Sequence, residues 1–364
     1  MSNIERKLAT IREIQDIFPI DGADAIEVAR VDGWNVVVKK GEFRVGEIAC
    51  YLEIDSWVPT EIAPFLSKGK EPNEYNGVKG ERLRSVKLRG QISQGLLIKL
   101  EHHIGESVLP FDHVRHVVTL GEDVTQKLGI QKWEAPVPAQ LAGQIEGLFP
   151  THLVSKTDQE RIQNCYKDVQ NRVRMMQTDL FSNVEFVIEE KLDGSSCTII
   201  CHNGEFKVCS RNLELRRDEN NSFWKAAMKY EKTLMDFHTK HNRNFAIQGE
   251  LIGLGIQGNP YKLQGQELYV FDMYDIDVGF YLVRDVREKF VEQFGMKNVP
   301  VVGHSSDTAG NFEASDVERI LKVADGQSFV NPETIREGVV YKCTKDGRLT
   351  FKAISNRWLI KKGE

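Results

Sequence analysis

The sequence lacks a hydrophobic run long enough to cross a bilayer. Its first residues, Met1 to Lys7, also lack the charged-then-apolar order of a secretory signal. Hydrophobic residues make up 41% of the chain and charged residues 28%, proportions typical of a soluble globular protein. For a chain of 364 residues, enough for two domains, we therefore expect no membrane partner and an intracellular location, cytoplasmic or nuclear.

Cysteine motifs are missing as well. The six cysteines include no Cys-x-x-Cys pair, which argues against a zinc ribbon. Cys197, Cys201 and Cys209 lie in strand-like sequence, where a free cysteine behaves as a small apolar residue. The sequence thus predicts buried free thiols in a reducing compartment.

Histidine pairs with metal-ligand spacing are few. His113 with His116, and His238 with His241, have helix-like spacing but no matching third ligand nearby in the sequence. We expect these four residues to be ordinary histidines.

An excess of positive charge is absent too, because the formal net charge is −5. This argues against a protein coated with nucleic acid, although unevenly placed charge can still form a basic groove. Two stretches are locally basic, Lys79 to Arg89 and Arg348 to Lys362. The part from Arg82 to Arg89 either contacts nucleic-acid phosphates or is a solvated face.

Short strands and turns, with little helix, occupy the first third of the chain. Asp32-Gly33 separates two β-rich runs, 26–31 and 34–38, and predicts a hairpin. Further runs at 48–54, 82–89 and 95–100 bring the total to about five short strands. We predict a small β-barrel over residues 1–135, with an OB-fold as the first candidate and an SH3-like barrel or open sheet as the alternatives.

A linker rich in proline and glycine is predicted over residues 136–150. The pattern beyond it, over 151–364, is mixed α/β. Helices are predicted from Ser222 with Asn221 as its cap, over 284–294 and over 315–323. Together with the barrel, this gives an α+β fold class with antiparallel sheets in the second domain.

Six short motifs in the second domain contain reactive or charged residues. The first, Glu189-Glu190-Lys191-Leu192-Asp193-Gly194, follows a strand and precedes a turn, which puts the lysine at a strand end. The others follow in chain order: Ser210-Arg211-Asn212, Ile247-Gln248-Gly249-Glu250-Leu251-Ile252-Gly253, Tyr269-Val270-Phe271-Asp272, Arg336-Glu337-Gly338-Val339-Val340 and Thr350-Phe351-Lys352-Ala353.

In this order, the six motifs resemble those of the covalent nucleotidyltransferase superfamily of ATP-dependent ligases and capping enzymes. The resemblance covers roughly residues 150–360 and implies an ATP-grasp-like ligase domain. It further implies that Lys191 attacks ATP to form a covalent lysyl-AMP, with Mg²⁺ or Mn²⁺ as cofactor. A lysine reacts only when deprotonated, and a nearby metal ion favours that form.

The resemblance also implies roles for the remaining motif residues. Glu250 and Glu337 would hold the metal ion, largely through waters, and Asp193 would contact a metal-bound water or the ribose. Lys352 would neutralise the α-phosphate as charge develops, and Arg211 would grip a phosphate or the sugar. The nucleotide-binding set is completed by Glu190, Gly194, Arg161 and Phe271, of which Phe271 either stacks on adenine or is only part of the core.

Domain order separates the branches of the superfamily. Capping enzymes and DNA ligases place an OB domain after the nucleotidyltransferase domain, whereas here a barrel comes first and the chain ends soon after Lys352. This order, and the segments 149–164 and 351–357, resemble RNA ligase family 5. The resemblance implies sealing of nicks in duplexes with an RNA 3′-hydroxyl strand. End-healing enzymes that act upstream are candidate partners. A DNA ligase-like enzyme, and a nucleic-acid-binding protein with an inactive ligase domain, are the alternatives.

Two positions depart from the superfamily pattern. Many ligases have a second lysine two residues after the first in the last motif, where this chain has Ile354. Lys342 or Lys361 is a candidate substitute for that phosphate contact. The nucleophile motif is followed by Ser195-Ser196 rather than by an arginine or threonine.

Overall fold

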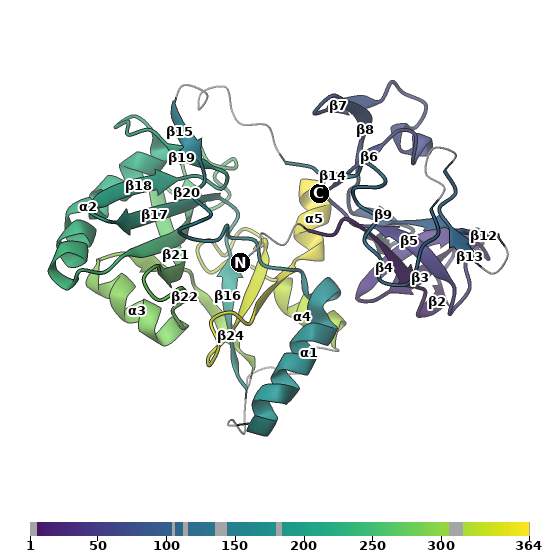
Figure 1. Cartoon of the computed structure of the whole chain (residues 1–364). Helices are drawn as coiled ribbons and strands as arrows, with labels where there is room; N and C mark the ends of the chain where they lie inside the picture. Colours follow the sequence, from purple (N-terminus) through teal and green to yellow (C-terminus); the bar gives the residue numbers. More distant parts are fainter. Residues whose placement is uncertain are drawn as a thin grey trace. The chain divides into compact units, whose positions relative to one another are not determined.

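The computed structural model describes residues 6–103, 106–111, 116–134, 144–179, 184–305 and 316–363. The chain divides into two compact units, each visible in Figure 1. The first comprises Met1–Pro136 with Leu359–Glu364, and the second comprises Val137–Trp358. Residues 135–143, which include the first half of the predicted linker, lie outside the described residues, as does His113. Ile145–Leu148, in its second half, forms a strand instead, because it pairs with a strand of the second unit.

The first unit is built from short antiparallel strands, as the sequence predicts, but fourteen are described where about five were expected. Its main sheets have the orders β1-β5-β11, β2-β3-β4 and β14-β6-β8-β7. The described strands are β1 (Ala9–Glu13), β2 (Asp16–Pro19), β3 (Ile26–Val31), β4 (Trp34–Lys39), β5 (Ile48–Leu52), β6 (Ser56–Pro59), β7 (Asn73–Tyr75), β8 (Val78–Arg82), β9 (Val86–Leu88), β10 (Gln91–Ser93), β11 (Leu96–Lys99), β12 (Glu101–His103), β13 (Glu106–Val108) and β14 (Gln131–Lys132).

The hairpin predicted at Asp32-Gly33 is confirmed, because Val31 pairs with Trp34 across a two-residue turn. Asp32 adopts a positive φ of 49°, a conformation that aspartate tolerates better than most residues. Trp34 is fully buried, and its ring lies 6.0 Å from that of Tyr51 on β5. Alternate residues of β4 are buried, so the strand's period-2 pattern supplies the barrel core.

Two antiparallel sheets form the second unit (Figure 1). The larger has the order β15-β19-β18-β17-β20-β21-β22, with β23 pairing in parallel to β21, and the smaller has the order β24-β16-β25-β26. The strands are β15 (Ile145–Leu148), β16 (Phe186–Lys191), β17 (Ser195–His202), β18 (Glu205–Cys209), β19 (Leu213–Leu215), β20 (Phe245–Gly253), β21 (Gln266–Asp275), β22 (Phe280–Tyr281), β23 (Lys297–Asn298), β24 (Val301–His304), β25 (Gly338–Cys343) and β26 (Thr350–Ile354).

Each sheet of the second unit has its own helices and its own core. Helices α2 (Ser222–His241) and α3 (Arg284–Gln293) pack on the larger sheet through residues such as Leu234 and Val291. Helices α1 (Ile162–Asp179) and α4 (Val317–Ala324) pack on the smaller sheet. The predicted α+β class with antiparallel sheets is confirmed, and all six cysteines are buried and free, as expected.

The predicted helices at 222, 284–294 and 315–323 are present, the last beginning at Val317 with Asp316 as its cap. Two helices were not predicted, α1 and α5 (Asn356–Lys362). The first 18-residue helix is strongly polar, so its narrow apolar stripe of Ile162, Val169 and Val173 gives a weak sequence signal. No helix among the described residues has the length and apolarity needed to span a bilayer.

The helix cap predicted at Asn221 is confirmed. Its side-chain oxygen accepts hydrogen bonds from the backbone N–H of Phe223 at 2.8 Å and of Trp224 at 3.2 Å. These are donors that the first turn of a helix cannot satisfy internally. At the other end, Asn242 closes α2 with a positive φ of 48°.

Replacing Asn221 by alanine is therefore expected to lower the free energy of unfolding by about 1 kcal/mol, because both N–H groups lose their acceptor. Urea unfolding followed by circular dichroism measures this. Asn221→Asp keeps the acceptor and should stay close to the parent. An alanine variant as stable as the parent would show that the cap contributes nothing.

Candidate functional site

Lys191 is the last residue of β16, and strand pairing determines its neighbour. β16 and β25 run antiparallel with Lys191 opposite Gly338, which brings the preceding residue, Glu337, beside the lysine. The Lys191 Nζ lies 2.7 Å from Glu337 Oε1. A side chain at Gly338 would meet the carbonyl oxygen of Ala353 at 2.2 Å, so only glycine allows β25 and β26 to approach this closely.

Two further carboxylates lie within electrostatic reach of Lys191, those of Glu250 and Asp193. Glu250 comes from β20 in the larger sheet, and the Asp193 N–H donates to the Tyr261 hydroxyl at 2.6 Å. A Cβ on Gly194 would lie 2.5 Å from the Leu251 carbonyl, so this glycine lets the turn after β16 approach β20. The two sheets thus meet at the lysine.

The charges of this cluster perturb one another. Burial alone would lower the pKa of Lys191, but Glu337, Glu250 and Asp193 outweigh it and raise the pKa. Burial raises the pKa of Glu250 to about 8, with Glu337 and Asp193 adding repulsion. The pKa of Glu337 is raised by burial too, although Lys191 opposes the shift. The Lys191 amine, surrounded by three acidic side chains, therefore stays protonated and unreactive.

The carboxyl oxygens of Glu337, Glu250 and Asp193 are ligands of the kind that a hard divalent cation prefers. No group of three or more metal-binding side chains in the described parts of the chain has the arrangement of a closed metal site. Magnesium and similar ions commonly keep several waters and use only one or two carboxylates. Glu250 and Glu337, with Asp193 beside them, fit an ion of that kind.

Glu190 lies on the same strand and is almost fully buried. Its Oε2 accepts a hydrogen bond from the Phe329 backbone N–H at 2.8 Å, while its Oε1 has no partner among the described residues. Burial raises the pKa of this carboxyl, while the Ser328 side chain, the Phe329 N–H and the charge of Arg336 act in the opposite direction. Glu190 therefore presents an acceptor next to the nucleophile, where the sequence placed a nucleotide contact.

A buried ionic network lies one residue further back. Glu189 is 1% exposed and pairs with Arg284 and Arg287 on α3 and with Lys342 on β25, the last at 3.3 Å. Burial alone would raise the pKa of Glu189, but these three cations outweigh it and hold the pKa at about 2. Removing one partner from such a network typically destabilises a protein strongly, so the network anchors β16 to the larger sheet.

Phe271 and Lys342 belong to this network. Phe271 is partly buried beside the cluster of Leu192, Ile252, Tyr261 and Val299, and its carbonyl accepts from Arg287 and Lys342. The Lys342 Nζ also lies 2.5 Å from Asp272 Oδ1. The idea that Lys342 replaces the missing phosphate-binding lysine is therefore wrong, because its ammonium is buried among carboxylates.

Arg211 and Lys352 come from different sheets but share one partner. Arg211, in the turn between β18 and β19, places Nη2 3.1 Å from Asp158 Oδ2. Lys352, on β26, places Nζ 3.1 Å from Asp158 Oδ1. Arg161 is buried, and its backbone forms a parallel bridge with that of Lys352.

Sequence reasoning thus missed several residues that shape the site. Tyr261 lies in a loop and carries no motif. Asp158 lies in the family-like segment 149–164, but only Arg161 was assigned a role there. Arg284 and Arg287 have the spacing of one helix face, which is as common on solvated helices as on buried ones. Glu189 was part of the first motif, but its pairing depends on α3, nearly 100 residues away in the chain.

The histidines behave as expected. His238 is buried, with Nε2 accepting from the Gly204 N–H at 3.0 Å and Nδ1 2.6 Å from the Arg243 carbonyl. His241 packs on the Phe237 ring at 4.5 Å. His116 pairs with Glu122 at 2.9 Å.

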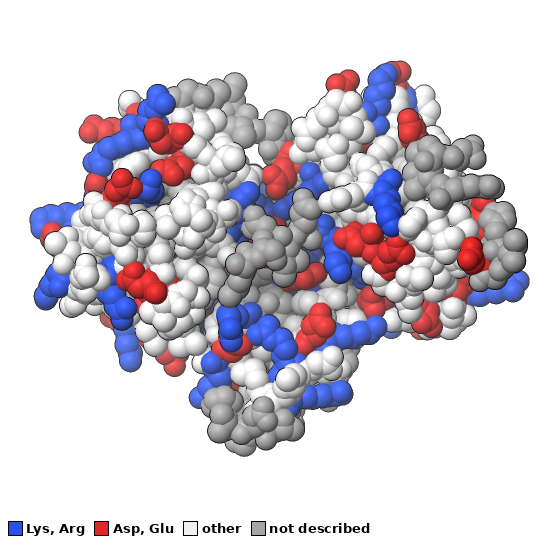
Figure 2. All heavy atoms as spheres, in the orientation of Figure 1, with Lys and Arg blue, Asp and Glu red and all other residues white. Residues whose placement is uncertain are grey.

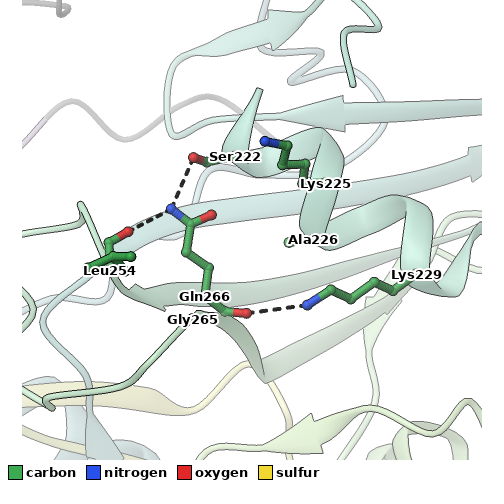
Figure 3. Close-up of a pocket in the computed structure, with 7 residues that line it drawn as sticks. All are labelled: Ser222, Lys225, Ala226, Lys229, Leu254, Gly265 and Gln266. Atoms are coloured by element: carbon green, nitrogen blue, oxygen red, sulfur yellow. Dashed lines mark hydrogen bonds between the residues drawn. The ribbon is translucent and has the colours of Figure 1, made fainter. Parts of the chain in front are cut away.

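A cavity of about 320 Å³ lies at the start of α2 (Figure 3). In it, the side-chain nitrogen of Gln266 donates to the Ser222 hydroxyl at 3.1 Å and to the Leu254 backbone carbonyl at 2.8 Å. The Lys229 ammonium donates to the backbone carbonyl of Gln266 at 3.3 Å. The cavity has no acidic group or reactive nucleophile. Its lining residues are Ser222, Lys225, Ala226, Lys229, Leu254, Gly265 and Gln266.

Charged side chains of both signs are interspersed over the face of the protein shown in Figure 2. In the predicted basic stretch, Arg82 Nη2 forms an ion pair with Asp55 Oδ1 at 2.7 Å. The guanidinium carbon of Arg82 lies 3.9 Å from the centre of the Trp133 ring. Lys87 on β9 is exposed. Only part of that stretch is therefore available to phosphates.

A family model described as RNA ligase matches residues 184–354, and an OB-fold domain model matches residues 8–100. No curated protein matched.

Solved structures of Naegleria gruberi RNA ligase are similar over nearly the whole chain. A glutamate-to-alanine variant with ATP and Mn has 41% identity and a TM-score of 0.82, covering 99% of this chain and 100% of that one. An aspartate-to-alanine variant without ligand has 42% identity and a TM-score of 0.81, covering 97% of each chain. The same ligase with PPi has 41% identity and a TM-score of 0.79, covering 98% of each chain.

The raised pKa of Glu250 predicts a pH-dependent stability without metal or nucleotide. As pH rises from the ordinary value of 4.5 toward about 8, the unfolded carboxyl loses its proton while the folded one retains it, so folding loses stability. Glu250→Gln does not titrate and should escape this loss. The Tm of Glu250→Gln minus the Tm of the parent should therefore increase from pH 5 to pH 8.

Melting curves in EDTA provide the measurement, and Glu292→Gln is the control because Glu292 is exposed on α3. A constant difference between Glu250→Gln and the parent across this pH range would contradict the assignment.

Proposed function

Because this chain belongs to the RNA ligase family, we propose that it joins a 5′-phosphate to a 3′-hydroxyl on RNA at the expense of ATP, through AMP carried on Lys191. The observation that supports this most directly is the cluster at the end of β16. There a lysine, held 2.7 Å from Glu337, shares its environment with the carboxylates of Glu250 and Asp193.

The reaction has three steps. The Lys191 nitrogen attacks the α-phosphorus of ATP, forming an N–P bond while the bond to the β-phosphate oxygen breaks and pyrophosphate leaves. The RNA 5′-phosphate then takes the AMP, which releases the lysine and leaves a 5′–5′ pyrophosphate linkage. Finally the 3′-hydroxyl attacks the RNA phosphate, and AMP departs. Such transfers depend mainly on positioning and on neutralising charge.

Lys191 must lose a proton before the first step, and its surroundings oppose this. A divalent cation, Mg²⁺ or Mn²⁺, would be held by Glu250 and Glu337 with Asp193 nearby, and it supplies positive charge that favours the neutral amine. The similar Naegleria enzyme was solved with ATP and Mn. Glu337, which accepts from Lys191 in the free enzyme, is placed to hold the ammonium until then.

The remaining residues of the site suit the nucleotide. Arg211 and Lys352 are cations on the two sheets, suited to phosphates, and the buried Arg161 lies beside Lys352. Phe271 offers a ring for the adenine, and Glu190 offers an acceptor for a base or sugar donor. Gly194 keeps the turn after Lys191 close to β20.

A finer assignment follows from domain order. We propose family 5, in which residues 1–135 act as an OB module ahead of a ligase domain at 151–364, and the substrate is a nicked duplex with an RNA 3′-hydroxyl strand. The support is the OB-fold match at residues 8–100 and the ligase match that follows it. Enzymes that heal ends would act before it, because the reaction needs a 5′-phosphate and a 3′-hydroxyl.

Lys191→Ala is expected to lower adenylylation by a factor of roughly 10³ or more, because it removes the amine that would form the bond to AMP. The measurement is labelling with α-labelled ATP and Mn²⁺, followed by denaturing electrophoresis. Lys232→Ala, at an exposed position on α2, is the control and should label like the parent. Full labelling of Lys191→Ala would refute the assignment of the nucleophile.

Nick sealing is expected to depend on the terminal ribose. On duplexes that differ only in one 2′-hydroxyl, at the 3′-hydroxyl end of the nick, the ribose substrate should be sealed roughly tenfold faster or more, because a 2′-hydroxyl can both donate and accept. Single-turnover rates with preadenylylated nicks isolate this step. Equal rates would favour a DNA ligase-like enzyme instead.

A further inference from the structure

The Asp158 carboxylate pairs with the two cations that we assign to phosphate binding, Arg211 and Lys352. Asp158 Oδ2 lies 3.1 Å from Arg211 Nη2, and Asp158 Oδ1 lies 3.1 Å from Lys352 Nζ. Each oxygen therefore serves a different cation, one from the turn after β18 and one from β26. A carboxylate and a phosphate offer arginine and lysine the same kind of charged oxygen, so they compete for the same donors.

The position of Asp158 is imposed by its chain neighbours. The segment 155–160 crosses from one sheet to the other and is held along its length. The Ser155 carbonyl accepts from Gln248 at 2.9 Å, and the Thr157 hydroxyl lies 3.1 Å from that of Ser196, both partners belonging to the larger sheet. At its other end the Glu160 carbonyl accepts from the Lys352 N–H at 2.8 Å.

These anchors make the carboxylate a fixed neighbour of the phosphate site. Backbone and side-chain contacts on both sheets fix the segment, so Asp158 stays near Arg211 and Lys352 when a phosphate binds. A phosphate must then take the cations away from Asp158 and bear its negative charge nearby. Asp158 is about one-third exposed, so water can solvate it once it is displaced.

We propose that Asp158 is an internal competitor for the phosphate cations, which keeps Arg211 and Lys352 in place in the empty enzyme and weakens the hold on pyrophosphate. The inference rests on the proposed function, in which these two cations bind phosphate. After Lys191 has taken AMP, pyrophosphate must leave before RNA can approach. The return of the two cations to Asp158 favours that departure, so Asp158 is a positioning residue that acts through Arg211 and Lys352.

The test is the binding of inorganic pyrophosphate to the full chain, measured by calorimetry with Mn²⁺ present. Asp158→Asn keeps the shape and removes the charge, and its Kd for pyrophosphate should be roughly three- to tenfold lower than the parent's. Asp158→Glu retains the charge and should bind pyrophosphate like the parent. Asp168→Asn, an equal charge change at an exposed position on α1, should have no effect.

An Asp158→Asn protein that binds pyrophosphate as weakly as the parent, or more weakly, would overturn the proposal. Thermal unfolding checks that the variant is folded, and Asp158→Ser replaces it if it is not. Labelling with α-labelled ATP is run in parallel on the parent. Tighter pyrophosphate binding by Asp158→Asn without any labelling of the parent would refute the proposed function and support only the competition between Asp158 and phosphate for the two cations.

Discussion

The pairing of β16 with β25 is the constraint on which the site depends. It brings Glu337 to within 2.7 Å of Lys191. On the other edge of β25, Gly338 has no side chain to meet the Ala353 carbonyl, which lets β26 pack closely. The turn after β16 then approaches β20 at Gly194, which adds Glu250 from the larger sheet. A displacement of β16 along β25 by one residue would separate the nucleophile from its carboxylates.

A buried ionic network holds β16 in that register. Glu189, two residues before Lys191, is buried and meets Arg284, Arg287 and Lys342 in the interior. Buried ion pairs contribute less to stability than their number suggests, because desolvation offsets their attraction. Their directional contacts nevertheless specify one arrangement of β16, α3 and β25. One strand thus carries a structural carboxylate, a site carboxylate and the nucleophile in succession.

Cations of the site are paired with carboxylates in two places. Glu337 accepts from Lys191, and Asp158 occupies both Arg211 and Lys352. Each cation that the reaction needs is therefore already paired with a carboxylate that a ligand can replace. This keeps the side chains ordered without substrate, at the cost of a competing anion. The same principle explains why the lysine is protonated in the free enzyme and why a divalent cation must change its surroundings.

The sequence by itself determined the elements whose signals are local. The Asp32-Gly33 hairpin, the Asn221 cap and the order of the six motifs can all be recognised within a few residues, because turn geometry, capping and motif spacing act over short distances. Tertiary structure alone decided the partners of Glu189, the burial of Lys342 and the position of Asp158 between Arg211 and Lys352. Those contacts join residues 50 to nearly 200 positions apart, and no local pattern specifies which of many charged residues will meet.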